Sequence, residues 1–182
     1  MLTLVAALSM LPQERPIVEM MVYQRGVFEI ELLQDKAPKT VAHFLNLVDT
    51  KFYNGILFHR VVDKWVAQAG DPLSKTWTRE EALKAELGSY GEVKGLGDGG
   101  SGKTIPFEDN DVSHQPGTVG MALESPASDT GDSQFFINLE DNKRLDHKYC
   151  VFGRVTAGLE KIKTIRRGAP IVWMRRKAKA QP

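Results

Sequence analysis

The sequence has little cysteine and little net charge. Its 182 residues include one cysteine, Cys150, and its 24 basic and 23 acidic residues leave a formal net charge of +1. A single cysteine forms no internal disulfide, and with no Cys-x-x-Cys or Cys/His pair it indicates no structural zinc site. A net charge near zero gives no overall field to attract nucleic acid or an anionic membrane. Any partner is therefore expected to be selected by a local site.

Long apolar runs are also missing. No stretch reaches the roughly 18 residues that a membrane helix needs, so no membrane span is expected. The strongest candidate for targeting is MLTLVAALSMLPQERP at residues 1–16, where Pro12 ends a short apolar run that has no positive leading region. We expect residues 1–16 to be an N-terminal extension or an atypical export signal. Localisation is expected to be cytoplasmic, or exported or periplasmic if residues 1–12 are a truncated signal.

What the sequence does contain is a series of short strand patterns. Alternating apolar and charged residues at 17–33, with QRG between two runs, predict a two-stranded hairpin. Pro38 opens a helix whose apolar residues have the spacing i, i+3, i+4 and i+7. Two more strands are predicted within 58–72 and others at 117–123, 133–139, 149–155 and 171–174, with short helices at 78–87 and 159–165 and a glycine-rich loop at 88–102. Many short strands with helices at separated places predict one mainly β domain, a closed antiparallel barrel capped by helices.

One motif points to nucleotide binding when it is taken alone. GDGGSGKT at residues 97–104 has the spacing of a phosphate-binding loop. Such a loop works by leaving a buried strand and opening a helix, whose terminal amides bind the phosphates. Here Pro106 follows almost at once and no apolar strand precedes Gly97. We interpret the segment as a surface loop whose composition produces the match.

Metal and nucleophile chemistry find no support in the sequence. The four histidines have no His or Cys partner at ligand spacing, and no Gly-x-Ser-x-Gly motif nominates a nucleophilic serine. We expect no metal and no cofactor. The histidines are His43, His59, His114 and His147.

Five segments, taken in order, resemble the cyclophilin family of peptidyl-prolyl cis-trans isomerases. They are APKTVAHFLNLV, YNGILFHRVVDKWVAQAGDP, GTVGMA, DSQFFINL and LDHKYCVFGRV, within about residues 19–174. The resemblance implies a single isomerase domain at 17–174, followed by a basic tail at 175–182. It implies an eight-stranded antiparallel barrel closed by two helices, and Arg60 as the catalytic residue. The implied partners are proline-containing peptides and unfolded or partly folded proteins.

The reaction explains why one arginine can suffice. Amide resonance opposes rotation of the Xaa-Pro bond with a barrier of about 18–20 kcal/mol. In the twisted transition state the proline nitrogen regains a lone pair, so a positioned donor stabilises that state more than either planar one. Arg60 is a donor that keeps its charge near neutral pH.

A second polar side chain is expected beside this arginine. If Asp63, Lys64 and Trp65 form a three-residue hairpin loop, Arg60 lies opposite Gln68 on the same face. A two-residue loop would pair position 60 with 67 instead, but it needs positive φ at two residues, which Asp-Lys favours less than Asn-Gly does. The resemblance implies the first register, with Gln68 supporting Arg60.

The remaining site residues are implied by the resemblance alone. Phe135 and Phe136 alternate, so only one of them can line the groove, and we assign that place to Phe136. The implied substrate-binding residues are Trp65, Val66, Ala122, Leu123, Phe136, Arg144, Leu145 and Tyr149.

Several of these positions depart from the family pattern. Cyclophilins commonly have Phe and Met at positions 65 and 66, Asn at 123, Trp at 144 and His at 149. The change to Arg144 removes a large apolar wall that the family associates with cyclosporin, so weak cyclosporin binding with retained isomerase activity is expected. An insert at 73–95 replaces a shorter loop that the family has near a secondary pocket.

Two alternatives remain open. The first is a non-catalytic proline-peptide-binding or chaperone module that keeps the groove, which the changes at Leu123 and Arg144 would favour. The basic residues after position 165 also have no acidic neighbour in the sequence, and such tails can contact nucleic acid. A solvated end of the last strand fits the overall charge better, so no specific nucleic-acid partner is expected. Because barrels close their own edges, the chain is expected to be a monomer.

Overall fold

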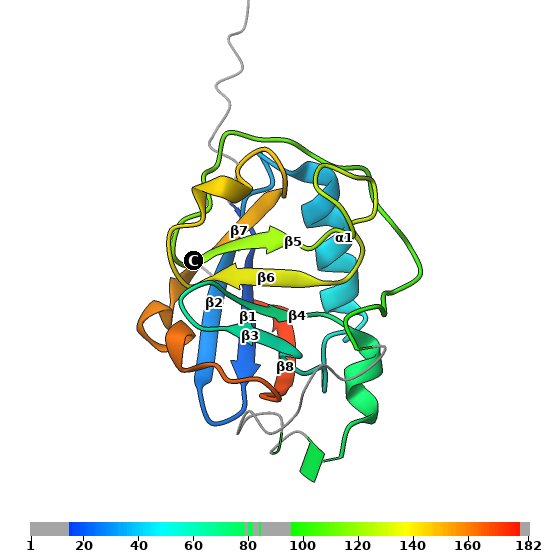
Figure 1. Ribbon diagram of the computed structural model, residues 1–182, viewed down its shortest axis with the longest axis vertical. Helices are drawn as coiled ribbons and strands as arrows, with labels where there is room; N and C mark the ends of the chain where they lie inside the picture. The colour runs from blue at the N-terminus through cyan, green and yellow to red at the C-terminus, as the bar shows by residue number, and fades with distance from the viewer. Residues whose placement is uncertain (1–14, 79, 82–83, 85–95, 179–182) are drawn as a thin grey trace, which may run out of the picture.

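Eight strands form one antiparallel sheet in the computed structural model, which describes residues 15–78, 80–81, 84 and 96–178 (Figure 1). The order across the sheet is β3-β4-β6-β5-β7-β2-β1-β8. The strands are β1 Ile17–Val22, β2 Gly26–Leu32, β3 Arg60–Val62, β4 Val66–Ala69, β5 Thr118–Met121, β6 Phe135–Asn138, β7 Val151–Ala157 and β8 Ile171–Arg176.

The sheet curls around a hydrophobic core. In Figure 1, β3 to β6 lie in front of β1, β2 and β8. In β1 every second side chain is buried, at Val18, Met20 and Val22, as the alternating sequence predicts. Phe135 of β6 is fully buried in this core. Its neighbour Phe136 therefore faces the other side of the sheet.

The helix predicted from Pro38 is α1, Pro38–Asp49. Its apolar face carries Phe44 into the core, where the ring centroid lies 5.0 Å from that of Phe152 and 5.7 Å from that of Phe135. Its own N-cap residue makes no side-chain hydrogen bond. The Glu108 carboxylate accepts from the first amides instead, at 2.7 Å from the backbone nitrogen of Thr40. No helix in the described part of the chain is long and apolar enough to cross a membrane.

The other predicted helices differ from α1. Residues Leu159–Thr164 form a 3-10 helix, η3, close to the predicted 159–165. The segment predicted as a helix at 78–87 lies mostly outside the described residues. At its start Thr78 and Glu81 form a capping box, in which the backbone nitrogen of each donates to the side chain of the other. Two further 3-10 turns are η1, Pro72–Thr76, and η2, Lys143–Leu145.

The prediction of a closed barrel is not confirmed. The edge strands β3 and β8 form no ladder with each other, and the sheet is an open, curled half-barrel. The residues just before β3 do meet the start of β8: Phe58 donates its backbone N–H to Ala169 at 2.9 Å, and Ile171, the first residue of β8, donates to Ile56 at 2.8 Å. The bridge between Leu57 and Pro170 is isolated, and it does not extend into a ladder between β8 and the three-residue strand β3.

The last strand extends beyond its predicted end at residue 174 and includes Arg175 and Arg176. These residues were predicted to begin a basic tail. Arg175 pairs with Glu19 at 2.8 Å, and the Arg176 guanidinium binds the Asp49 carboxylate, also at 2.8 Å. Tertiary contacts therefore neutralise basic residues that have no acidic neighbour in the sequence.

Candidate functional site

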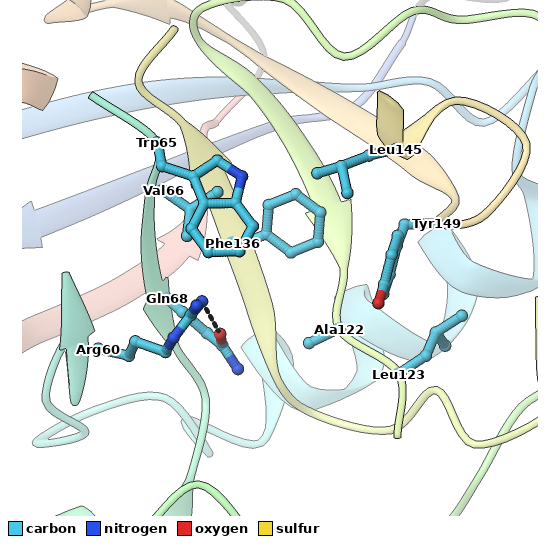
Figure 2. Close-up of a pocket in the computed structure, with 9 residues that line it drawn as sticks. All are labelled: Arg60, Trp65, Val66, Gln68, Ala122, Leu123, Phe136, Leu145 and Tyr149. Carbon is cyan, nitrogen blue, oxygen red and sulfur yellow. Dashed lines mark hydrogen bonds between the residues drawn. The ribbon is translucent and has the colours of Figure 1, made fainter. Parts of the chain in front are cut away.

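The hairpin of β3 and β4 brings Arg60 and Gln68 together. Arg60 pairs with Gln68 and Val62 with Val66 across a three-residue loop, which confirms the predicted register. Lys64 in the loop has φ 54°, the single positive φ among its three residues. One Arg60 Nη donates to Gln68 Oε1 at 3.3 Å, and both side chains border a pocket (Figure 2).

The pocket has a volume of about 220 Å³. Sites for drug-sized ligands span roughly 300–1,000 Å³, so this one suits a single small ring. In Figure 2 the Phe136 ring lies between Trp65 on one side and Leu145 and Tyr149 on the other. The lining residues are Arg60, Trp65, Val66, Gln68, Ala122, Leu123, Phe136, Leu145 and Tyr149. Every site residue expected from the sequence except Arg144 thus lies around one cavity.

Phe136 is held from three directions. Its ring stacks on that of His114, with centroids 5.6 Å apart, and meets Tyr149 edge-on at 5.9 Å. In the sheet it pairs with Gly120, and a Cβ on that glycine would lie 2.4 Å from Phe136 Cζ. Glycine at 120 therefore makes room for the ring that forms the apolar wall.

Trp65 contacts two arginines. The Arg60 guanidinium carbon lies 4.7 Å from the indole centroid, and that of Arg144 lies 4.9 Å from it. Both distances fall in the range of cation–π attraction. Arg144 thus lies outside the pocket lining and packs on a residue of its wall.

The charge of Arg60 is available to a ligand. Within the described ranges, no acidic side chain forms an ion pair with it. Burial lowers the pKa of the preceding His59 to about 4, although the nearby Asp71 acts in the opposite direction. His59 is therefore neutral near pH 7, whereas Arg60 keeps its charge.

A second cavity, of about 420 Å³, adjoins the first and shares Gln68, Ala122 and Leu123 with it. Its other walls include residues 97–100 of the glycine-rich loop, Asp132 and Gln134. The residues 97–104 that match a phosphate-binding loop form turns and coil there, with no helix after Thr104. Among the described residues, no three His, Cys, Asp or Glu side chains are grouped to hold a metal ion.

Gln134, which was not among the residues predicted from the sequence, lines the second cavity and contacts Gln68. Its Oε1 accepts from Gln68 Nε2 at 3.0 Å. One signal was present: Gln134 comes two residues before Phe136, and strand alternation places such residues on the same face. Nothing in the sequence, however, indicates that this face meets Gln68.

Comparison with known proteins identifies the family. A family model described as "Cyclophilin type peptidyl-prolyl cis-trans isomerase/CLD" matches residues 17–180. The chain belongs to this family of isomerases. It is 38% identical over 142 residues to peptidyl-prolyl cis-trans isomerase B of Bacillus subtilis (strain 168), covering 77% of this chain and 83% of that protein. It is 37% identical to peptidyl-prolyl cis-trans isomerase 10 of Caenorhabditis elegans, over 78% of each chain.

Solved structures of cyclophilins share the fold. A Cryptosporidium parvum cyclophilin type peptidyl-prolyl cis-trans isomerase superposes with a TM-score of 0.74 at 21% identity, covering 91% of this chain and 99% of that one. A second structure of that protein, determined in the presence of the dipeptide Ala-Pro, gives a TM-score of 0.71 at 22% identity and covers 90% and 99%. The half-barrel with its flanking helices is thus a cyclophilin-like fold.

Proposed function

We propose that the chain accelerates rotation about Xaa-Pro bonds in peptides and folding proteins, with the proline ring in the 220 Å³ pocket and Arg60 as donor to the proline nitrogen. The observation that carries the proposal is the placement of an arginine, unpaired with any described acid, at the mouth of an apolar pocket for one small ring. The structure of a related cyclophilin in the presence of Ala-Pro supports a proline ligand.

In this mechanism the pocket holds one side of the bond while the other side turns. Val66, Phe136 and Leu145 enclose the proline ring, and the preceding carbonyl swings in the open groove beside Ala122 and Leu123. As the amide twists, its nitrogen becomes a hydrogen-bond acceptor, and the Arg60 guanidinium donates to it. No bond is made or broken, so no general acid, metal or cofactor is required.

The energy required is modest. Shortening the isomerisation time of an Xaa-Pro bond from about 100 s to about 1 ms is a rate increase of roughly 10⁵. This corresponds to lowering the activation free energy by about 7 kcal/mol. A charged hydrogen bond contributes about 1.5–3 kcal/mol, and proline-ring binding and exclusion of water from the twisting amide supply the rest.

The test compares wild type with Arg60→Ala in an assay of Xaa-Pro peptide isomerisation. We expect at least a tenfold loss of kcat/KM with the fold intact. The matched control is Arg154→Ala, on β7, which removes an exposed ion pair with Glu31 and should leave the rate unchanged. Equal rates for wild type and Arg60→Ala would refute the proposed role. Peptide binding without any acceleration by wild type would favour the non-catalytic module.

A further inference from the structure

A chain of side-chain hydrogen bonds runs from Arg60 to the glycine-rich loop. Arg60 donates to Gln68 Oε1 at 3.3 Å, and Gln68 Nε2 donates to Gln134 Oε1 at 3.0 Å. Gln134 Nε2 then donates to two backbone carbonyls, of Gly97 at 2.6 Å and of Gly99 at 2.8 Å. Both glutamines are partly buried, and together these bonds link Arg60 to the backbone carbonyls of Gly97 and Gly99.

The two carbonyls decide which way each amide faces. A carbonyl oxygen can only accept, so the Gln134 nitrogen must face Gly97 and Gly99, and Gln134 Oε1 is left facing Gln68. That oxygen also only accepts, so Gln68 must turn its nitrogen toward it and its own Oε1 toward Arg60. With Gln68 reversed, its NH2 would face a guanidinium that has donors only. The carbonyls of Gly97 and Gly99 therefore set the donor-to-acceptor direction of every hydrogen bond in this series.

The loop that supplies these carbonyls is held in place. Gly97 donates its backbone N–H to Asp71 Oδ2 at 2.5 Å, and Leu73 donates to Asp71 Oδ1 at 2.8 Å. Asp71 is fully buried. A Cβ on Gly99 would lie 2.2 Å from Asp71 Oδ1, so the loop approaches Asp71 in a way that only glycine permits. We call the hydrogen bonds from Arg60 through Gln68 and Gln134 to the loop the relay. Asp71, which holds the loop, closely follows β4, the strand that carries Gln68, so β4 positions both Gln68 and the loop.

We propose that Gln134 is a positioning residue for the isomerase reaction: it sets the amide orientation of Gln68 and, through Gln68, the aim of the Arg60 guanidinium. This inference rests on the proposed function and adds to it a residue outside the proline pocket that orients the catalytic arginine. Gln134 lines the second cavity, so direct contact with a bound peptide is the rival explanation that the test must separate.

The first test is a double-mutant cycle with Gln134→Leu and Gln68→Ala. We expect Gln134→Leu to lower kcat about five- to tenfold with little change in KM. In the Gln68→Ala background the same substitution should cost less than twofold, because the residue through which Gln134 acts is gone. A loss of equal size in both backgrounds, or one confined to KM, would indicate direct peptide contact and overturn the proposal.

The second test is Gln134→Glu, which keeps the size of the side chain. An ionised carboxylate cannot donate to the carbonyl oxygens of Gly97 and Gly99, which repel it and turn it away from its position beside Gln68, so activity relative to wild type should fall near pH 7.5. It should recover as the pH falls and the carboxyl gains a proton to donate, an effect that a packing role would not produce. If the activity of Gln134→Glu relative to wild type stays constant with pH, the result would contradict the proposed positioning role of Gln134.

Folding and the proposed function are checked separately. Circular dichroism and the thermal midpoint of each variant show whether it is folded, and if Gln134→Leu is not, the pH series of Gln134→Glu decides the question. If Arg60→Ala loses activity while both Gln134 variants match wild type, only the relay is wrong. If Arg60→Ala is as active as wild type, the proposed role of Arg60 as donor is wrong.

Discussion

Arg144 takes the place of a tryptophan that the family commonly has near this pocket. Its guanidinium stacks on Trp65 instead of adding an apolar wall, and its side chain is exposed. The same indole also contacts Arg60, so one aromatic ring faces an arginine that lines the pocket and an arginine outside its lining. The substitution therefore changes what the rim offers to a large apolar ligand and leaves the pocket lining in place.

From this we predict weak binding of cyclosporin by the wild-type chain. Arg144→Trp should raise the cyclosporin affinity at least tenfold, because it restores a large apolar surface and an N–H donor. The rate of isomerisation should change less than threefold, since Arg144 does not line the pocket. Titration calorimetry of both proteins measures the affinities. A wild-type affinity equal to that of a tryptophan-containing relative would contradict the prediction.

At the scale of elements, the site depends on how β5 and β6 pack against each other. Gly120 of β5 is paired with Phe136 of β6, and the ring occupies the space where a side chain at 120 would be. The pairing of β6 with β4 on its other side places Gln68 beside the same ring. Three strands from distant parts of the sequence thus meet at Phe136.

We predict that Gly120→Ala damages the site out of proportion to its size. The added methyl would lie 2.4 Å from Phe136 Cζ, so the ring must shift into the proline pocket. We expect kcat/KM to fall at least tenfold, mainly through KM, and the free energy of unfolding to fall by roughly 1–3 kcal/mol. Peptide kinetics and urea unfolding measure the two effects. An alanine variant with unchanged KM would show that the Phe136 ring moves without entering the proline pocket.

At the scale of the whole molecule, burial of histidine links stability to pH. Burial lowers the pKa of His59 from 6.5 to about 4 and also lowers the pKa of His114. The unfolded chain therefore takes up protons at a pH where the folded chain does not. This contribution to stability is fully present above about pH 6.5 and is lost as the pH falls toward 4.

We predict that His59 alone accounts for roughly 2–3 kcal/mol of lost stability between pH 7.5 and 4.5. His59→Gln should lose correspondingly less stability than wild type between pH 7.5 and 4.5, whatever the stability of the variant at pH 7.5. The control is His147→Gln, which alters a histidine whose side chain is 69% exposed. Urea unfolding at the two pH values measures the difference. An equal loss of stability in wild type and His59→Gln would show that burial does not lower the pKa of His59 in the folded chain.

Much of the site could be predicted from the sequence, because its determinants are local. The length of the loop at Asp63–Trp65 sets the pairing of Arg60 with Gln68, and strand alternation separates Phe136 from Phe135. The helix from Pro38 and most strand positions also follow from patterns within a few residues. The proline-pocket residues came from the family resemblance, and the structure places all of them except Arg144 around one cavity.

Only the tertiary structure decided the features that join distant segments. Gln134 meets Gln68 across 66 positions and the Gly97 carbonyl across 37, and Arg175 meets Glu19 across 156. Whether the sheet closes depended on how the segments before β3 and β8 approach each other, and Pro170 lies at that point. Periodicity and turn chemistry report the conformation of neighbouring residues, whereas these contacts depend on how the whole sheet curls. The sequence by itself determined the ribbon that carries Arg60, and the fold decided what holds that arginine in position.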